Sequence, residues 1–283
     1  MSKNKKGACI GPITEASGIH DDLEKMTVRE YLFAESDEDL KVAPAVRKAL
    51  TMLEPLVHAV IEKVKSGGRV IYVGAGSSGR TAVADAAEML PTYGLSGVVR
   101  AIIAGGRKAL WEPVEGAEDD TRRGWRDLEN LGVSTQDVVI GVAASGKTPY
   151  VFAALQACIR HGITTGCVVC NPGTEMARMV HYPVEVIVGP EIIAGSSRLK
   201  AGSAQKFVLN KISNAAMVLG LGRVEGNEMV CMRPTNAKLL DRGAKMIVRK
   251  TDLSYDEAVA LLRGHEDVRS ALKAHRAGLM IKA

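Results

Sequence analysis

Two short segments rich in glycine and hydroxyl side chains have the composition of an anion-binding site. They are Gly74-Ala-Gly-Ser-Ser-Gly-Arg80, which follows an apolar run, and Ala144-Ser-Gly-Lys-Thr-Pro149, which follows another. Glycines let a backbone approach a ligand, and a helix that begins at such a loop adds free N–H groups. If both segments follow strands of one parallel sheet, they meet at its carboxyl edge and predict one phosphate site. The residues expected to bind are Ser77, Ser78, Gly79, Ser145, Gly146 and Thr148.

The first segment also fits the G-x-G-x-x-G pattern of dinucleotide-binding proteins. That interpretation needs an acidic residue at the end of the following strand, to bind a ribose hydroxyl. The chain has none there, since the next apolar run ends in Ile103-Ala-Gly-Gly106. A phosphate on a smaller ligand is the better interpretation.

Two carboxylates near these segments are candidates for acid–base chemistry. Glu88 ends the run Asp85-Ala-Ala-Glu88 in a stretch of small residues, which predicts partial burial and a raised pKa suited to an acid. Glu118 ends Glu115-Gly-Ala-Glu118, just before an amphipathic stretch. From the residues alone, a solvated helix position for Glu88 and a helix-capping role for the acidic cluster 115–120 that contains Glu118 are the better-supported interpretations.

Composition restricts the partners. The chain has 283 residues and a net charge of +5, no apolar run long enough for a membrane span, and only 4% aromatic residues, so we expect neither a membrane nor a nucleic acid as partner. The polar stretch Met1–Gly7 predicts no secretory signal. Five scattered cysteines favour a reducing compartment, the cytoplasm. Cys167 and Cys170 form a C-x-x-C inside an apolar run without a nearby histidine, so neither a metal nor a cofactor is expected.

The elements around these residues alternate. Short apolar strands are predicted at 69–73, 98–103, 138–143, 166–170 and 184–188, with helices between them, which is typical of an α/β protein whose parallel sheet has helices on both faces. Helices are predicted at 22–32, 43–65 (with a kink at Pro55), 201–219, 255–262 and 268–275. Residues 1–20 show no periodicity. The predicted division is an N-terminal segment 1–40, a domain 41–225 and a C-terminal helical segment 226–283.

Several segments, in this order, resemble the N-acetylmuramic acid 6-phosphate etherase family of the sugar isomerase (SIS) domain superfamily. They include GAGSSGRTAVADAAEMLPTYG (74–94), VEGAEDD (114–120), ASGKTPYV (144–151), GPEIIAGSSRLKAGSAQK (189–206) and PTNAKLLDR (234–242). The resemblance implies a flavodoxin-like three-layer SIS domain with a small helical tail. It implies a homodimer with substrate sites near the subunit interface, and cleavage of the D-lactyl ether to N-acetylglucosamine 6-phosphate and D-lactate. It implies Glu88 as the acid and Glu118 as the base.

The chain also departs from the usual family pattern. Ser77 stands where threonine is usual, Met89-Leu90 where cysteine and proline are usual, and Lys147 where arginine is usual. The changes beside Glu88 bear on which sugar and which C3 substituent the site accepts. A sugar-phosphate isomerase or epimerase, or a non-catalytic sugar-phosphate-binding regulator, would use the same phosphate loops and stays the alternative.

Overall fold

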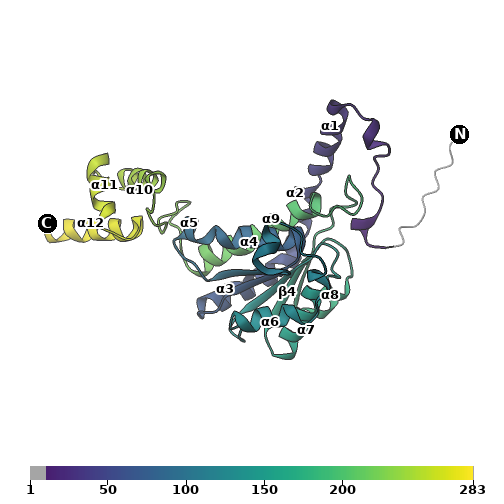
Figure 1. Ribbon diagram of the computed structural model, residues 1–283. Helices are drawn as coiled ribbons and strands as arrows, with labels where there is room; N and C mark the ends of the chain where they lie inside the picture. Colours follow the sequence, from purple (N-terminus) through teal and green to yellow (C-terminus); the bar gives the residue numbers. More distant parts are fainter. Residues whose placement is uncertain (1–10, 283) are drawn as a thin grey trace.

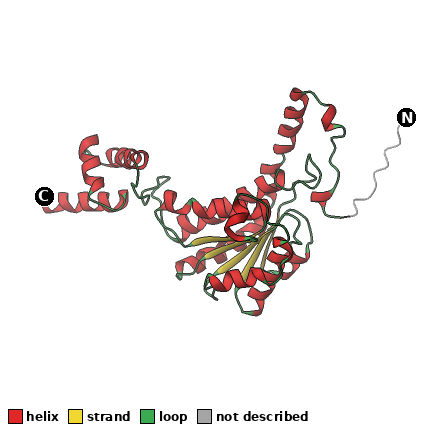
Figure 2. Ribbon diagram, in the orientation of Figure 1, coloured by secondary structure: helices red, strands yellow, loops and turns green. Residues whose placement is uncertain are grey.

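A five-stranded parallel sheet forms the centre of the protein. The computed structural model describes residues 11–282, with side chains to 278. The strands, yellow in Figure 2, are β1 (Val70–Gly74), β2 (Val99–Ile103), β3 (Val138–Val142), β4 (Thr164–Val169) and β5 (Tyr182–Glu185). Their order in the sheet is β2-β1-β3-β4-β5. Val, Ile and other apolar residues run continuously through β1 and β3 because both faces of the sheet are covered. The predicted α/β class and parallel sheet are confirmed.

Helices cover the two faces of the sheet in separate layers (Figure 1). Tyr72 of β1 packs into a core with α3 (Leu50–Lys65), α4 (Gly76–Ala87) and α9 (Lys200–Ala215), which continues as a π-helical turn, Ala216–Gly220. Ile71 faces the opposite core, with α6 (Arg123–Asn130), α7 (Pro149–Arg160) and α8 (Glu175–Met179). This is the predicted three-layer, flavodoxin-like sandwich.

Some predicted boundaries are wrong. The single helix expected over 43–65 is two helices, α2 (Val42–Lys48) and α3, which meet at Ala49. An i→i−3 hydrogen bond from Met52 N to Ala49 O (3.1 Å) tightens the chain at this junction, whereas Pro55 lies inside α3. The last strand lies at 182–185 rather than 184–188, and as an edge strand it accommodates Pro183.

The N-terminal part lies against the sheet domain and then projects from it. The helix expected at 22–32 is a 3₁₀ turn, Leu23–Lys25, followed by α1 (Val28–Asp39) with a capping box between Thr27 and Glu30. Residues 11–20 contain only the turn Ile13–Glu15, yet Thr14 is fully buried and bonds to Asn171 at the end of β4. Residues 1–10, including the polar stretch Met1–Gly7, lie outside the described part.

The C-terminal helices have a core of their own. They are α10 (Ala237–Lys250), α11 (Tyr255–Arg263) and α12 (Val268–Lys282), and they project on the side of the sheet domain away from α1 (Figure 1). Leu239, Ile247 and Leu262 are among the side chains they bury together. The exact domain limits stay predictions. Within residues 11–282, no helix combines the length and apolar character that crossing a membrane requires.

Candidate active site

The two serine loops leave the sheet side by side. After β1 the chain crosses to β2 on one side, and β3 lies on the other side of β1. Gly74 of β1 pairs with Val142 of β3, so the carboxyl ends of these strands coincide. In a sheet of this order, ligands bind in the crevice at this reversal between β1 and β3. Ser77–Ser78 and Ser145 follow those strand ends.

Two long helices begin at this edge without a side-chain cap. The first hydrogen bond of α4 runs from Gly79 N to Ala75 O, and neither α4 nor α7 has a capping side chain. By contrast, Glu191 accepts bonds from Lys200 N and Ala201 N (both 2.9 Å) at the start of α9. The uncapped N–H groups of α4 and α7 therefore face the reversal point, where an anion would be stabilised.

The hydroxyl side chains of the two loops are partly accessible. Ser77, Ser78, Ser145 and Thr148 are all half-buried. Ser145 Oγ accepts a bond from Lys147 N (3.2 Å), which leaves its hydroxyl hydrogen free to donate. Their contact with a phosphate stays a prediction.

The predicted glycines allow close packing. A Cβ on Gly79 would lie 2.6 Å from Ile103 Cγ1, so glycine lets α4 lie directly on the sheet. Gly146 has φ +68° and a Cβ there would lie 2.5 Å from Thr174 Cγ2. Both glycines are buried and shape the loops, and their contact with substrate stays a prediction.

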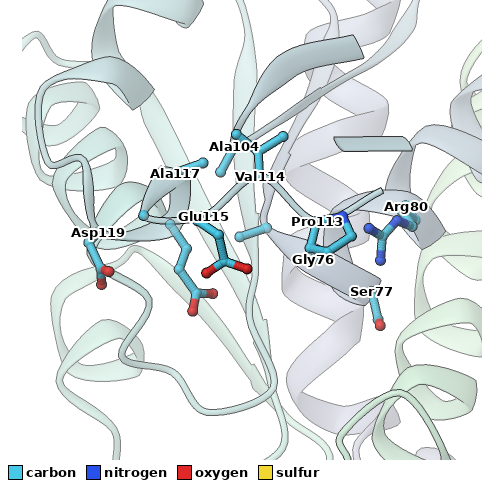
Figure 3. A pocket seen from close by; sticks show the side chains of 12 residues that line it. Gly76, Ser77, Arg80, Ala104, Pro113, Val114, Glu115, Ala117 and Asp119 are labelled. Carbon is cyan, nitrogen blue, oxygen red and sulfur yellow. The ribbon is translucent and has the colours of Figure 1, made fainter. Parts of the chain in front are cut away.

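A pocket of about 340 Å³ lies between the start of α4 and the segment after β2 (Figure 3). It contains Ser77 on one wall and Glu118 on the other, so the structure brings a phosphate-loop serine and the candidate base together. Ser78, Ser145, Thr148 and Glu88 are not among its lining residues. The lining is Ala75, Gly76, Ser77, Arg80, Ala104 and Pro113–Asp119.

Glu118 does not cap the following helix. It lies in a 3₁₀ turn, Ala117–Asp119, that Gly116 enters with φ +69°. Asp120 accepts the bonds from Arg122 N and Arg123 N, at 2.9 and 3.0 Å, before α6. The acidic cluster therefore caps the start of α6 through Asp120, as the capping interpretation predicts, and not through Glu118, whose exposed carboxylate is free to face the pocket.

Glu88 lies away from this pocket. It is the residue that ends α4, and a rise of about 1.5 Å per residue places its Cα about 16 Å along the helix from that of Ser77. Its side chain is exposed, so the predicted partial burial is wrong. The buried carboxylate of α4 is Asp85, whose pKa is raised by burial although Asn210 (2.6 Å) and Ser213 (3.0 Å) donate bonds to it.

The pocket also contains two charged residues that were not among the predicted site residues, Arg80 and Glu115. Arg80 Nε donates to Ala109 O (2.9 Å) and ties α4 to the opposite wall. The spacing in the sequence could have identified Arg80, because it lies three residues after Ser77 and therefore on the same face of the helix.

The structure supports the buried-strand interpretation of the C-x-x-C pair. Cys167 and Cys170 are fully buried, and burial raises the pKa of each thiol to about 12. In the described part of the chain, no three His, Cys, Asp or Glu side chains gather in a way that could hold a metal ion. Metal-free chemistry stays a prediction.

The fold and the placement of these loops define the class as SIS-domain proteins. Residues 52–159 match the family described as glucokinase regulatory protein N-terminal SIS domain. The phosphoheptose isomerase of Neisseria gonorrhoeae shares the fold, with a TM-score of 0.53 at 16% identity over 67% of this chain and 98% of the isomerase.

Relatives over nearly the whole chain identify the family. The N-acetylmuramic acid 6-phosphate etherase of Bacteroides thetaiotaomicron is 51% identical, over 93% of this chain and 95% of the relative. The etherase of the same name from Bacteroides fragilis is 49% identical, over 98% and 99%. The chain belongs to the N-acetylmuramic acid 6-phosphate etherase family.

Proposed function

We propose that this protein cleaves the D-lactyl ether of N-acetylmuramic acid 6-phosphate to N-acetylglucosamine 6-phosphate and D-lactate. The observation that carries the proposal is that Glu118 and Ser77 line one pocket beside the β1–β3 reversal point. The phosphate would bind between the starts of α4 and α7, with Ser78, Ser145 and Thr148. The sugar would then extend into the pocket toward Glu118.

The reaction requires one base and one acid. In the open-chain sugar the C1 aldehyde makes the C2 proton acidic, and the Glu118 carboxylate removes it. The resulting enolate expels the C3 oxygen, which Glu88 protonates, so that D-lactate leaves with its own oxygen. Water then adds across the C2–C3 double bond and restores a hydroxyl at C3. Acid–base assistance contributes typically about 10²–10⁴-fold for each such group.

The two carboxylates belong to different parts of one chain, and this supports a homodimeric site. Glu88 is exposed, lies about 16 Å along α4 from Ser77, and does not line the pocket that contains Glu118. A second copy would supply Glu88 to the pocket. Exposed apolar side chains of α1, namely Val28 (78% exposed), Leu32 and Phe33, offer surface that a second copy would cover.

The decisive experiment is incubation of the purified protein with N-acetylmuramic acid 6-phosphate and measurement of D-lactate. Release of lactate distinguishes the etherase from an isomerase or epimerase, which would convert the sugar without lactate, and from a regulator, which would only bind it. The assay is repeated with a chelator. We expect equal rates, and activity lost with chelator and regained with zinc or magnesium would contradict the metal-free mechanism.

We place this activity in the cytoplasm, in the recycling of cell-wall amino sugars. The four cysteines in the described part, Cys158, Cys167, Cys170 and Cys231, are buried free thiols, which fits a reducing compartment. A substrate that already carries a phosphate also fits a cellular compartment where phosphoryl donors are present.

A further inference from the structure

The basic side chain of the pocket has no role in the proposed chemistry. Arg80 is the one basic residue in the pocket lining, and Glu115, Glu118 and Asp119 line the same space. Figure 3 shows Arg80 beside Ser77, across the pocket from Glu115 and Asp119. Its Nε is held by Ala109 O (2.9 Å), and no described carboxylate forms an ion pair with it. Its terminal nitrogens are therefore available to a ligand.

The proposed substrate carries a second anion besides its phosphate. The lactyl group is attached to the C3 oxygen and ends in a carboxylate. Since Glu118 would act on C2, which is bonded to C3, the lactyl group must lie in the pocket that contains Glu118. Placing another carboxylate beside Glu115, Glu118 and Asp119 is unfavourable unless a cation pairs with it.

We propose that Arg80 binds the lactyl carboxylate and thereby selects the 3-O-lactyl sugar over its unsubstituted product. The inference rests on the proposed function and adds a specificity residue to the same site. A guanidinium held at Nε can offer its two terminal nitrogens as parallel donors to a carboxylate. The phosphate would bind at the uncapped N-terminal ends of α4 and α7, away from this contact. Cleavage of the ether removes the carboxylate from the sugar, so the product loses this contact.

The test uses two unreactive ligands that differ only in the lactyl group. Reduction of C1 gives N-acetylmuramitol 6-phosphate and N-acetylglucosaminitol 6-phosphate, which lack the aldehyde that acidifies C2. Binding is measured by calorimetry for wild type, Arg80→Met and Arg107→Gln, an exposed arginine of the same segment outside the pocket lining. We expect Arg80→Met to raise the dissociation constant of N-acetylmuramitol 6-phosphate by about 10- to 100-fold. The dissociation constant of N-acetylglucosaminitol 6-phosphate should change less than about threefold. Arg107→Gln should change neither.

A third ligand, the lactamide of N-acetylmuramitol 6-phosphate, tests the charge itself. Wild type should bind the amide about as weakly as Arg80→Met binds the acid, and Arg80→Met should not distinguish acid from amide. Equal weakening of both alditols by Arg80→Met would mean that Arg80 contacts the phosphate or only shapes the pocket, which overturns the inference. Equal binding of both alditols by wild type, or no effect of Arg80→Met, also overturns it. Absence of D-lactate release with the natural substrate would instead refute the proposed etherase activity, since alditol binding does not depend on turnover.

Discussion

Gly74 and Val142, 68 residues apart in sequence, are partners in adjacent parallel strands, which places the loops that follow them at one point of the sheet edge. Each loop leads into a helix without a side-chain cap. This relationship is the structural basis of the phosphate site and of the first prediction.

Ser78→Ala and Ser145→Ala should each weaken the binding of N-acetylglucosamine 6-phosphate. Each loses one hydrogen bond to a charged phosphate, about 1.5–3 kcal/mol, or roughly 10- to 150-fold in the dissociation constant measured by calorimetry. Ser66→Ala is the matched control, because the Ser66 hydroxyl donates to Glu62 O (3.0 Å) and the residue lies before β1, at the amino end of the strands. Unchanged binding by both loop variants would exclude the shared phosphate site.

Glu118→Gln and Glu88→Gln should differ in hydrogen exchange at C2. Glu118→Gln cannot accept the C2 proton, so it should abolish both D-lactate release and deuterium uptake at C2 in heavy water. Glu88→Gln keeps the base and should strongly slow lactate release while exchange persists, because proton removal precedes departure of lactate. Proton NMR reads the exchange. The opposite pattern would reverse the two roles, and normal lactate release by Glu118→Gln would refute the mechanism.

Mixing the two inactive variants should restore activity if each site takes its carboxylates from two copies. Half of randomly mixed dimers combine both variants, and each of these has one intact site, so activity should approach about a quarter of wild type. The variants are unfolded and refolded together, and each refolded alone is the control. No recovery, with mixed dimers shown by mass spectrometry, would mean that both carboxylates act within one chain.

Glu38 should make stability depend on pH. It is 4% exposed and contacts Lys200, Lys41 (2.6 Å) and His20 (3.3 Å). Burial, the largest single effect, raises its pKa, but the hydrogen bonds and charges of Lys200 and Lys41 together lower it from 4.5 to about 2. A lowered carboxyl pKa stabilises the fold above the unfolded value, and this stabilisation is lost as the pH falls from about 4.5 toward 2.

Glu38→Gln should therefore lower the free energy of unfolding at pH 7 by about 3 kcal/mol. Below pH 5, the free energy of unfolding of this variant should also depend less steeply on pH. Urea unfolding between pH 3 and pH 7 measures both quantities. Asp22→Asn, which breaks an exposed pair with Lys25, is the control and should change stability by about 0.5 kcal/mol or less. An unchanged slope in Glu38→Gln would assign the acid sensitivity to other carboxylates.

The sequence by itself determined the parts of the fold that depend on local pattern. Continuous apolar runs such as those at β1 and β3 specify strands buried on both faces, and the Gly/Ser segments after them specify loops that lead into helices. The hydroxyl chemistry of Ser78 and Ser145 follows from residue type. The alternation of strands and helices was sufficient for the α/β class because each element has its own periodicity.

Only the tertiary structure decided which carboxylates face the pocket. The sequence places Glu118 and Asp120 in one acidic cluster before α6. In the structure Asp120 accepts the backbone bonds at the start of α6, while Glu118, in the turn that follows Gly116, lines the pocket. Within α4, packing against α9 buries Asp85, while the end of the helix leaves Glu88 exposed. Likewise the buried Thr14 is hydrogen-bonded to Asn171, 157 residues away, and to Gly195. Local periodicity does not predict which of these side chains are buried, since burial is decided by neighbours that are distant in sequence.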